Sequence, residues 1–292
     1  HTFSHVNIKK VNNYGFLSDT NFIPKNLRKK NLIVVIGDSY VEAVQVKNSA
    51  TFHSILDQEI ENYNVYPFGV SGAPLSQYLA YANFAKLQFE PDIYVFLLYS
   101  NDFDESWYKF KRAPGFHYFK ENGDLHLIDY SPSLIKRIIR ESAFIRYLII
   151  DLKINERIRN IFYSKNNLQY NKNKLDDEVL GNKAIDLFLK QIDILSNSSK
   201  VIVMLDGDRS SIYKGDTERD KTTVATRFFQ KVSNNIKINP NLHLLDLHSI
   251  FLNDWKINNK EFNYKYDGHY NEWGHTVVGK ALSNFIRKLM NQ

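Results

Sequence analysis

Short runs of β-branched and aromatic residues recur along the chain, each bounded by polar or turn-forming residues. The clearest is Asn31–Gly37, an unbroken apolar stretch that ends at a glycine. Such a run is typical of a strand that is buried on both faces of a sheet. Further runs of this kind are Asp92–Tyr99, Lys200–Leu205 and, with weaker patterns, Tyr63–Phe68 and Leu242–Leu247. The pattern therefore predicts a set of buried strands.

The segments between these runs carry apolar residues at the three- and four-residue spacing of an amphipathic helix. This spacing predicts helices around Leu75–Leu87 and Ile185–Leu195, and a closing helix over Asn271–Met290. Strands that alternate with helices indicate a parallel sheet covered by helices on both faces. The predicted fold class is thus α/β.

One region breaks this alternation. Between about residues 104 and 182 the chain is polar and aromatic, and we interpret it as an insertion into a single domain of residues 31–292. Residues 1–30 then form an N-terminal extension. Within the insertion, Phe116–Ile128 has the pattern of a hairpin whose Asn-Gly pair supplies the turn.

The insertion continues into a basic, apolar pattern over Ser133–Ile161. Its arginines are Arg137, Arg140, Arg146, Arg157 and Arg159. The pattern fits a helix packed on the core with a solvated basic face. It also fits a surface that meets a membrane or an anionic partner.

Composition narrows the function classes. The chain has 292 residues, of which 43% are hydrophobic and 24% charged, the balance of an ordinary globular protein. Its net charge of +6 is spread along the chain, which disfavours nucleic acid as a partner. The absence of cysteine excludes a disulfide framework, a thiolate zinc site and a cysteine nucleophile.

No stretch reaches the length of about 20 apolar residues that crosses a membrane. The chain begins at His1 without a signal peptide. We therefore expect a mature form or a fragment of a longer protein that is extracytoplasmic or membrane-anchored at full length.

Four short segments carry candidate chemistry. Ser39 follows the first predicted strand, so it should lie at the carboxyl edge of the sheet, where open α/β folds bind ligands. Gly72 follows the second strand, and a glycine there lets a backbone N–H approach a ligand closely. Taken singly, these segments also fit an ordinary helix cap and a turn glycine.

The other two segments lie further along. Asn101 follows the third strand, where its amide could stabilise an oxyanion, although it could also cap a helix. His269 lies late in the chain with Asp267 close by, and a histidine held by a carboxylate is the usual base for a serine hydroxyl. Their order and their shared positions at strand ends favour a joint catalytic role.

With these four blocks the chain resembles the SGNH or GDSL hydrolases, a family named for the Ser, Gly, Asn and His of its motifs. The resemblance covers roughly residues 32–284. It implies a three-layer α/β/α, flavodoxin-like fold with five parallel strands. By the same resemblance Ser39 is the nucleophile, His269 the base and Asp267 its partner. The N–H groups of Ser39 and Gly72 and the amide of Asn101 would form the oxyanion hole.

Two positions depart from the family pattern. Tyr99 stands two residues before Asn101, where many members have glycine, so the room for substrate differs there. Asp267 precedes His269 by two residues instead of three, a spacing similar to that of SGNH-like sugar O-acetyltransferases. His275, in the same segment, is the competing candidate for the base.

Four residues near these blocks are candidate substrate contacts: Asp38, Tyr99, Arg209 and Tyr270. Asp206 and Asp208 could hold a metal ion, but no third ligand is identifiable, so we expect no metal site and no cofactor.

The sequence therefore predicts a serine-dependent ester hydrolase or acyltransferase. Tyrosines and tryptophans near the blocks could stack on sugar rings, which favours O-acetyl groups of a bacterial carbohydrate as substrate, although they could equally be core residues. The alternatives are a non-catalytic glycan-binding or assembly module and a lipid esterase at a membrane surface. A partner or anchor at the membrane would then lie outside this chain.

Overall fold

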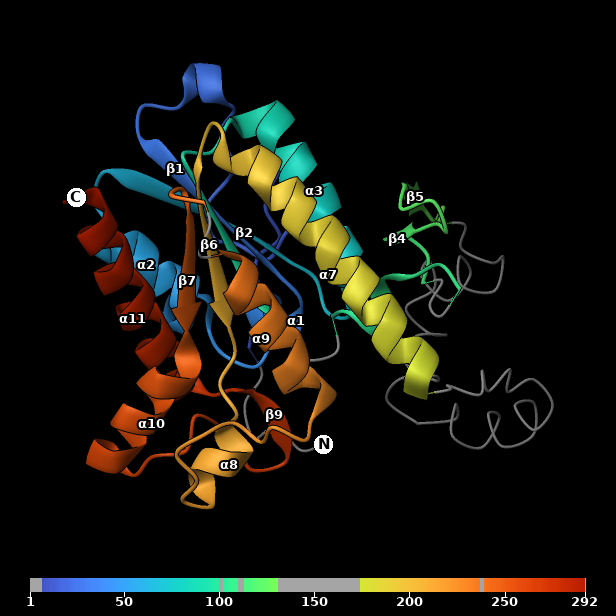
Figure 1. The fold of residues 1–292 in the computed structure, drawn as a ribbon. Helices are drawn as coiled ribbons and strands as arrows, with labels where there is room; N and C mark the ends of the chain where they lie inside the picture. Colours follow the sequence, from blue (N-terminus) through green and yellow to red (C-terminus); the bar gives the residue numbers. More distant parts are fainter. Residues whose placement is uncertain (1–6, 100–101, 110–112, 131–173, 237–238, 292) are drawn as a thin grey trace, which may run out of the picture.

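The computed structural model describes residues 7–99, 102–109, 113–130, 174–236 and 239–291 (Figure 1). Asn101 and the basic segment Ser133–Ile161 lie outside the described residues. None of the helices in the described part of the chain is long and apolar enough to cross a membrane.

Five strands form one parallel sheet at the centre of the molecule (Figure 1). They are β1 (Asn31–Gly37), β2 (Tyr63–Gly69), β3 (Ile93–Leu98), β6 (Lys200–Leu205) and β7 (Leu242–Asp246). Their order is β2-β1-β3-β6-β7, the flavodoxin-like arrangement. The predicted five-stranded parallel sheet is confirmed.

Helices cover both faces of the sheet, which completes the predicted three layers. One face carries α3 (Leu75–Phe89), α7 (Lys174–Ser196) and α9 (Val224–Ile236). The other carries the longer helices α2 (Phe52–Glu59), α10 (Leu247–Asn258) and α11 (Glu272–Met290). Two short helices, α1 (Ser39–Glu42) and α8 (Arg209–Tyr213), lie on that second face, at the carboxyl ends of β1 and β6.

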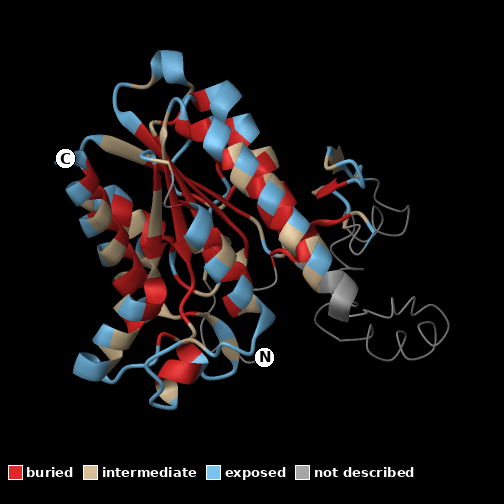
Figure 2. Ribbon diagram, in the orientation of Figure 1, coloured by how far each residue is buried: buried red, intermediate tan, exposed pale blue. Residues whose placement is uncertain are grey.

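The strands read as continuous apolar runs because successive side chains enter different cores. In β1, Val34 packs with the α3, α7 and α9 layer, while Ile33 and Val35 pack with the opposite layer. All three are fully buried, as are most residues of the central strands (Figure 2). The sheet is therefore a rigid support for the loops at its ends.

The described part of the predicted insertion holds the expected hairpin. Strands β4 (His117–Phe119) and β5 (Leu125–Leu127) are antiparallel. The predicted Asn-Gly pair lies in its turn, where Gly123 takes a left-handed φ of 85° and its N–H donates to Lys120 O. The end of the predicted insertion belongs to α7, which begins at Lys174.

Residues 7–30, within the predicted N-terminal extension, contribute to the main core. They contain a one-turn 3-10 helix, η1 (Lys25–Leu27). Phe22 is buried and stacks on Tyr66 of β2 with ring centroids 4.3 Å apart. Phe16 packs against Phe68 of the same strand at 4.6 Å.

The remaining short elements lie near strand ends. Two 3-10 helices are η2 (Asn48–Ala50) and η3 (Asp104–Ser106). A second hairpin pairs β8 (Asn263–Tyr264) with β9 (Asp267–Tyr270), just before α11. Figure 1 shows β9 and α8 at the same end of the sheet.

A close contact between β2 and α1 fixes where α1 lies. A Cβ atom on Gly69 would come within 2.3 Å of the backbone nitrogen of Glu42 and 2.6 Å of the carbonyl carbon of Val41. Both are backbone atoms, which cannot move aside as a side chain can. Glycine at the end of β2 is therefore required by the position of α1.

We predict that Gly69→Ala lowers the free energy of unfolding by roughly 3 kcal/mol, because an added methyl in a packed site forces a backbone shift. Chemical denaturation followed by circular dichroism measures this. The matched variant is Gly215→Ala, whose methyl would meet nothing within 4 Å and whose φ is 92°. It should lose only the left-handed strain of about 1 to 2 kcal/mol. Equal losses in the two variants would contradict the steric explanation.

Candidate active site

Ser39 lies at the carboxyl end of the sheet, as predicted. It is the first residue of α1 and follows β1 after one residue, Asp38. Asp38 caps the helix, because its Oδ1 accepts a hydrogen bond of 2.9 Å from the N–H of Tyr40. This cap holds the backbone on both sides of Ser39.

The structure brings His269 and Asp267 to Ser39 from a distant part of the sequence. His269 Nε2 lies 2.7 Å from Ser39 Oγ. On the other side of the ring, His269 Nδ1 is hydrogen-bonded to Asp267 Oδ1. The same carboxylate oxygen accepts the backbone N–H of His269 at 3.0 Å. With the Nδ1 proton facing Asp267, Nε2 can accept the serine proton.

Opposing effects act on the two acidic residues of this region. Burial acts to raise the pKa of Asp267, but hydrogen bonds from the backbone and ring of His269 outweigh it, and the pKa lies below its usual value. Asp267 is therefore ionised at neutral pH, as the partner of a histidine base must be. For Asp38, burial prevails and raises the pKa to about 6.

The competing candidate, His275, is not at the serine. Its ring is buried in α11, where Nδ1 accepts the N–H of Phe52 at 3.3 Å. Burial, reinforced by nearby His53, Lys9 and His269, lowers its pKa well below the usual value. The geometry thus favours His269 over His275 as the base.

Two of the predicted substrate contacts, Asp38 and Tyr270, are hydrogen-bonded within the protein. Tyr270 has no exposed surface, and its hydroxyl donates to the buried carboxylate of Asp206. Asp38 is only 4% exposed and is occupied as a helix cap. Neither residue is among those that line the cavity beside the triad loop.

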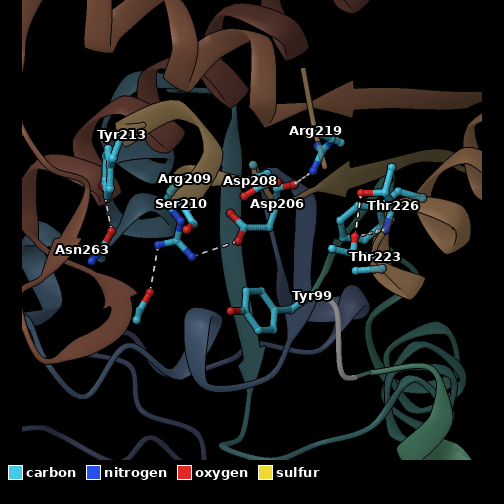
Figure 3. A pocket seen from close by; sticks show the side chains of 14 residues that line it. Tyr99, Asp206, Asp208, Arg209, Ser210, Tyr213, Arg219, Thr223, Thr226 and Asn263 are labelled. Atoms are coloured by element: carbon cyan, nitrogen blue, oxygen red, sulfur yellow. Dashed lines mark hydrogen bonds and ion pairs between the residues drawn. The ribbon is translucent and has the colours of Figure 1, made fainter. Parts of the chain in front are cut away.

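The other two, Tyr99 and Arg209, line a cavity of about 570 Å³ beside the triad loop (Figure 3). Gly268, which separates Asp267 from His269, also lines it. Arg209 is itself only 8% exposed and is held by an ion pair with Asp206. Figure 3 shows the labelled polar side chains of Asp208, Arg219, Thr223 and Asn263 around the same space.

The oxyanion-hole predictions rest on a loop that the structure describes in part. Gly72 has a φ of 77°, and the N–H of the next residue donates to Val70 O, as in a turn with glycine at its third position. The preceding Ser71 N–H donates to Glu42 Oε2 at 2.8 Å, which ties this loop to α1. Asn101 lies outside the described residues, so its role stays a prediction.

Asp206 and Asp208 each have a separate partner within the protein. Asp206 pairs with Arg209, and Asp208 caps α8 by accepting the N–H of Ser211 at 3.1 Å. Within the described ranges, no three His, Asp or Glu side chains are grouped so that they could hold a metal ion.

Sequence reasoning missed two residues of the site. Tyr40 contacts the ring of His269, with centroids 5.0 Å apart, and its hydroxyl donates to Gly268 O at 2.9 Å. Glu42 holds the Gly72 loop, as described above. Their only sequence signal is that they stand one and three residues after Ser39, on a helix too short to show a periodic pattern.

Comparison with known proteins gives similarity at the level of the fold. No family model and no curated protein matches the chain. Among solved structures, a G-D-S-L family lipolytic protein from Veillonella parvula has 13% identity and a TM-score of 0.46, over 87% of this chain and 96% of its own. A psychrotrophic esterase from Pseudoalteromonas has 10% identity and a TM-score of 0.49, over 90% and 100%.

A third similar structure is a two-domain esterase active on acetylated mannans. It has 11% identity and a TM-score of 0.49, and the match covers 90% of this chain but 50% of that protein. The structural neighbours are thus lipolytic proteins and esterases. The chemistry of the site in this chain follows from its own side chains.

We predict that stability falls in acid partly through His53, which is buried in α2 and hydrogen-bonded to Val41 O. Burial, aided by the charge of Lys9, lowers the pKa of His53 from 6.5 to about 3. Above pH 6.5 His53 is neutral in both the folded and the unfolded chain, so the free energy of unfolding does not depend on its titration. As pH falls from 6.5 toward 3, only the unfolded chain binds the proton, and the free energy of unfolding decreases. In His53→Gln the loss of unfolding free energy between pH 6 and 4 should be smaller by roughly 2–3 kcal/mol.

Urea denaturation at a series of pH values, each protein referred to its own stability at pH 8, measures this difference. Parallel curves for the two proteins would show that His53 is protonated equally in the folded and unfolded states.

Proposed function

We propose that the protein is a serine-dependent ester hydrolase or acyltransferase of the SGNH type, acting on O-acetyl groups of a carbohydrate. The observation that carries the proposal is the 2.7 Å contact between Ser39 Oγ and His269 Nε2, with Asp267 hydrogen-bonded behind the ring. A serine hydroxyl, a base within hydrogen-bond reach and a third group that orients the base are the parts that nucleophilic catalysis needs.

In the first step His269 Nε2 removes the Ser39 proton while Oγ attacks the ester carbonyl carbon. The carbonyl oxygen becomes an oxyanion, for which the N–H groups of Ser39 and Gly72 and the Asn101 amide are the proposed donors. Asp267 remains ionised and stabilises the imidazolium. Collapse of this intermediate breaks the bond to the alcohol, which leaves with the proton from His269, and Ser39 holds the acetyl group.

In the second step a hydroxyl group takes the place of the departed alcohol. His269 removes its proton, the oxygen attacks the acetyl-serine, and collapse returns the proton to Ser39 Oγ. If the hydroxyl belongs to water the product is acetate, and if it belongs to a sugar the product is a new acetyl ester. The triad serves both reactions equally.

The lining of the cavity beside the triad supports a carbohydrate over a long acyl chain. Its polar side chains include Asp208, Ser210, Arg219, Thr223 and Asn263. Its aromatic side chains are Tyr99, Tyr213 and Phe229, which suit the faces of sugar rings. Among the described residues that line it there is no Leu, Ile, Val or Met, the side chains that a fatty acyl chain would contact.

We predict that Ser39→Ala and His269→Asn each lower kcat for p-nitrophenyl acetate by roughly 10⁶-fold, because the nucleophile or its base is lost. The matched control is His275→Asn, in which the new amide oxygen can still accept the Phe52 N–H. It should retain kcat within a factor of about three. Release of p-nitrophenol measures all four proteins after circular dichroism has shown that they are folded.

Activity that survives in Ser39→Ala would refute the acyl-enzyme. A wild type that binds oligosaccharides saturably but cleaves no ester would instead identify a non-catalytic glycan-binding module.

We also predict a preference for short acyl groups and polyhydroxylated partners. The wild type should hydrolyse p-nitrophenyl acetate at least about 10-fold faster, in kcat/KM, than p-nitrophenyl decanoate, because the cavity offers a long chain no aliphatic wall. Adding an oligosaccharide should divert part of the acetyl group into acetylated sugar, which mass spectrometry detects. Faster turnover of the decanoate, with no acetylated sugar, would favour a lipid esterase.

A further inference from the structure

The peptide unit between the acid and the base of the triad is held from outside by two side chains. The carbonyl of Gly268 accepts a hydrogen bond of 2.9 Å from Arg209 Nη1. It accepts another, also of 2.9 Å, from the hydroxyl of Tyr40. Arg209 comes from α8 after β6, and Tyr40 is the neighbour of Ser39 in α1. Three separate elements therefore meet at one carbonyl oxygen.

The direction of this carbonyl also sets the direction of an N–H group. The oxygen of Gly268 and the N–H of His269 belong to the same planar peptide and point in opposite directions. That N–H donates to Asp267 Oδ1, the oxygen that also bonds the His269 ring. Fixing the carbonyl thus fixes the donor that holds the carboxylate, and the carboxylate in turn orients the imidazole.

Arg209 is itself held in one place. Its Nη2 lies 3.0 Å from Asp206 Oδ2 and 2.9 Å from the Tyr40 hydroxyl. Tyr270 donates to the other oxygen of Asp206, and its ring lies 4.8 Å from the Arg209 guanidinium. All four side chains are at most 8% exposed. A buried network of this kind is rigid when every member is paired.

The protonation states of the network suit this role. Burial acts to lower the pKa of Arg209, but Asp206 and the two tyrosines outweigh it and raise the pKa, so the guanidinium stays charged. Burial raises the pKa of Tyr40 above its usual value, so its hydroxyl keeps the proton that it donates. Two donors on one carbonyl also polarise the peptide and strengthen its N–H as a donor.

We propose that Arg209 and Tyr40 are positioning residues of the triad, which act by clamping the Gly268–His269 peptide so that Asp267 and His269 are aligned on Ser39. This inference rests on the proposed function. It replaces the prediction that Arg209 binds substrate directly. Because Gly268 has no side chain to restrict its rotation, these two hydrogen bonds restrain its carbonyl.

The test compares Arg209→Met and Tyr40→Phe with two control variants. Each control removes a guanidinium or a tyrosine hydroxyl far from the triad. Arg28→Met removes a guanidinium that donates to Phe89 O at 2.9 Å, near the amino ends of the strands. Tyr66→Phe removes a hydroxyl that accepts the Ile23 N–H at 2.8 Å. Each protein is checked by circular dichroism and thermal unfolding before its kinetics are measured.

The expected result is a fall in kcat of roughly 10²-fold for Arg209→Met and a smaller fall for Tyr40→Phe, with KM little changed, because a misplaced base slows chemistry without weakening binding. The rate constant for reaction of Ser39 with a fluorophosphonate should fall in parallel. A purely structural loss would reduce the number of reactive sites and leave the rate constant at each site unchanged. The two distant variants should react as the wild type does.

A double-mutant cycle separates positioning from direct substrate contact. When His269→Ala already removes the base, Arg209→Met should cause no further loss of the residual rate, because its route of action is gone. A further loss of similar size in that background would overturn the proposal and return Arg209 to substrate binding. Should Arg209→Met fail to fold because Asp206 is left unpaired, Tyr40→Phe in the same cycle decides the question.

One measurement does not depend on turnover. Hydrogen exchange of residues 263–270, followed by mass spectrometry, should be faster in both clamp variants and unchanged in the two distant ones. Wild-type exchange in both clamp variants would overturn the clamp even if the enzyme is active. A wild type that neither cleaves esters nor reacts with the fluorophosphonate would overturn the proposed function, while the exchange data would still decide whether these residues hold the peptide.

Discussion

The parallel register of the central sheet is the constraint on which the site depends. β1 is paired on both sides, with β2 and with β3, so its end cannot shift without breaking two ladders. The terminal glycines of β1 and β2, Gly37 and Gly69, lie opposite each other in this register. The carboxyl ends of parallel strands lie at one edge of the sheet. Ser39 and the Gly72 loop follow two adjacent strands, so they begin at neighbouring positions on this edge.

Buried charge sets a second constraint at this edge. Asp206 and Arg209 form an ion pair in which both side chains are less than 10% exposed. Removing one partner of such a pair leaves an uncompensated charge away from water, whereas the complete pair is neutral. The pair therefore has to form as a unit when the ends of β6 and α8 come together. The tyrosines around it supply hydrogen bonds that water would otherwise provide.

The sequence predicted the centre of the sheet well because β1, β3 and β6 are buried on both faces and show apolar runs with no competing helical period. β1 and β6 have the boundaries expected for them. The Ser39, Asp267 and His269 grouping was also predictable, since short motifs at strand ends meet at a common edge. The sequence could not show how deeply each side chain near the site is buried. Tyr270 and Tyr99 look alike in the sequence, yet one is fully buried and the other lines the cavity.

Hydrogen bonds to backbone atoms could not be predicted from the sequence either. Nothing in the residue types around Gly268 indicates that its carbonyl receives two donors, because a carbonyl is present at every position. Arg209 could be recognised as a residue near the site, but not as a donor to a main-chain oxygen.

The aromatic packing of residues 7–30 has a practical consequence for where the folding unit begins. Phe16 and Phe22 lie against β2 in the same core as the sheet, although they precede the first strand. A protease cut between Phe22 and Asn31 would detach two buried rings and leave an apolar surface exposed to water. The shortest fragment that keeps its solubility therefore starts ahead of Phe16, and not at the first strand.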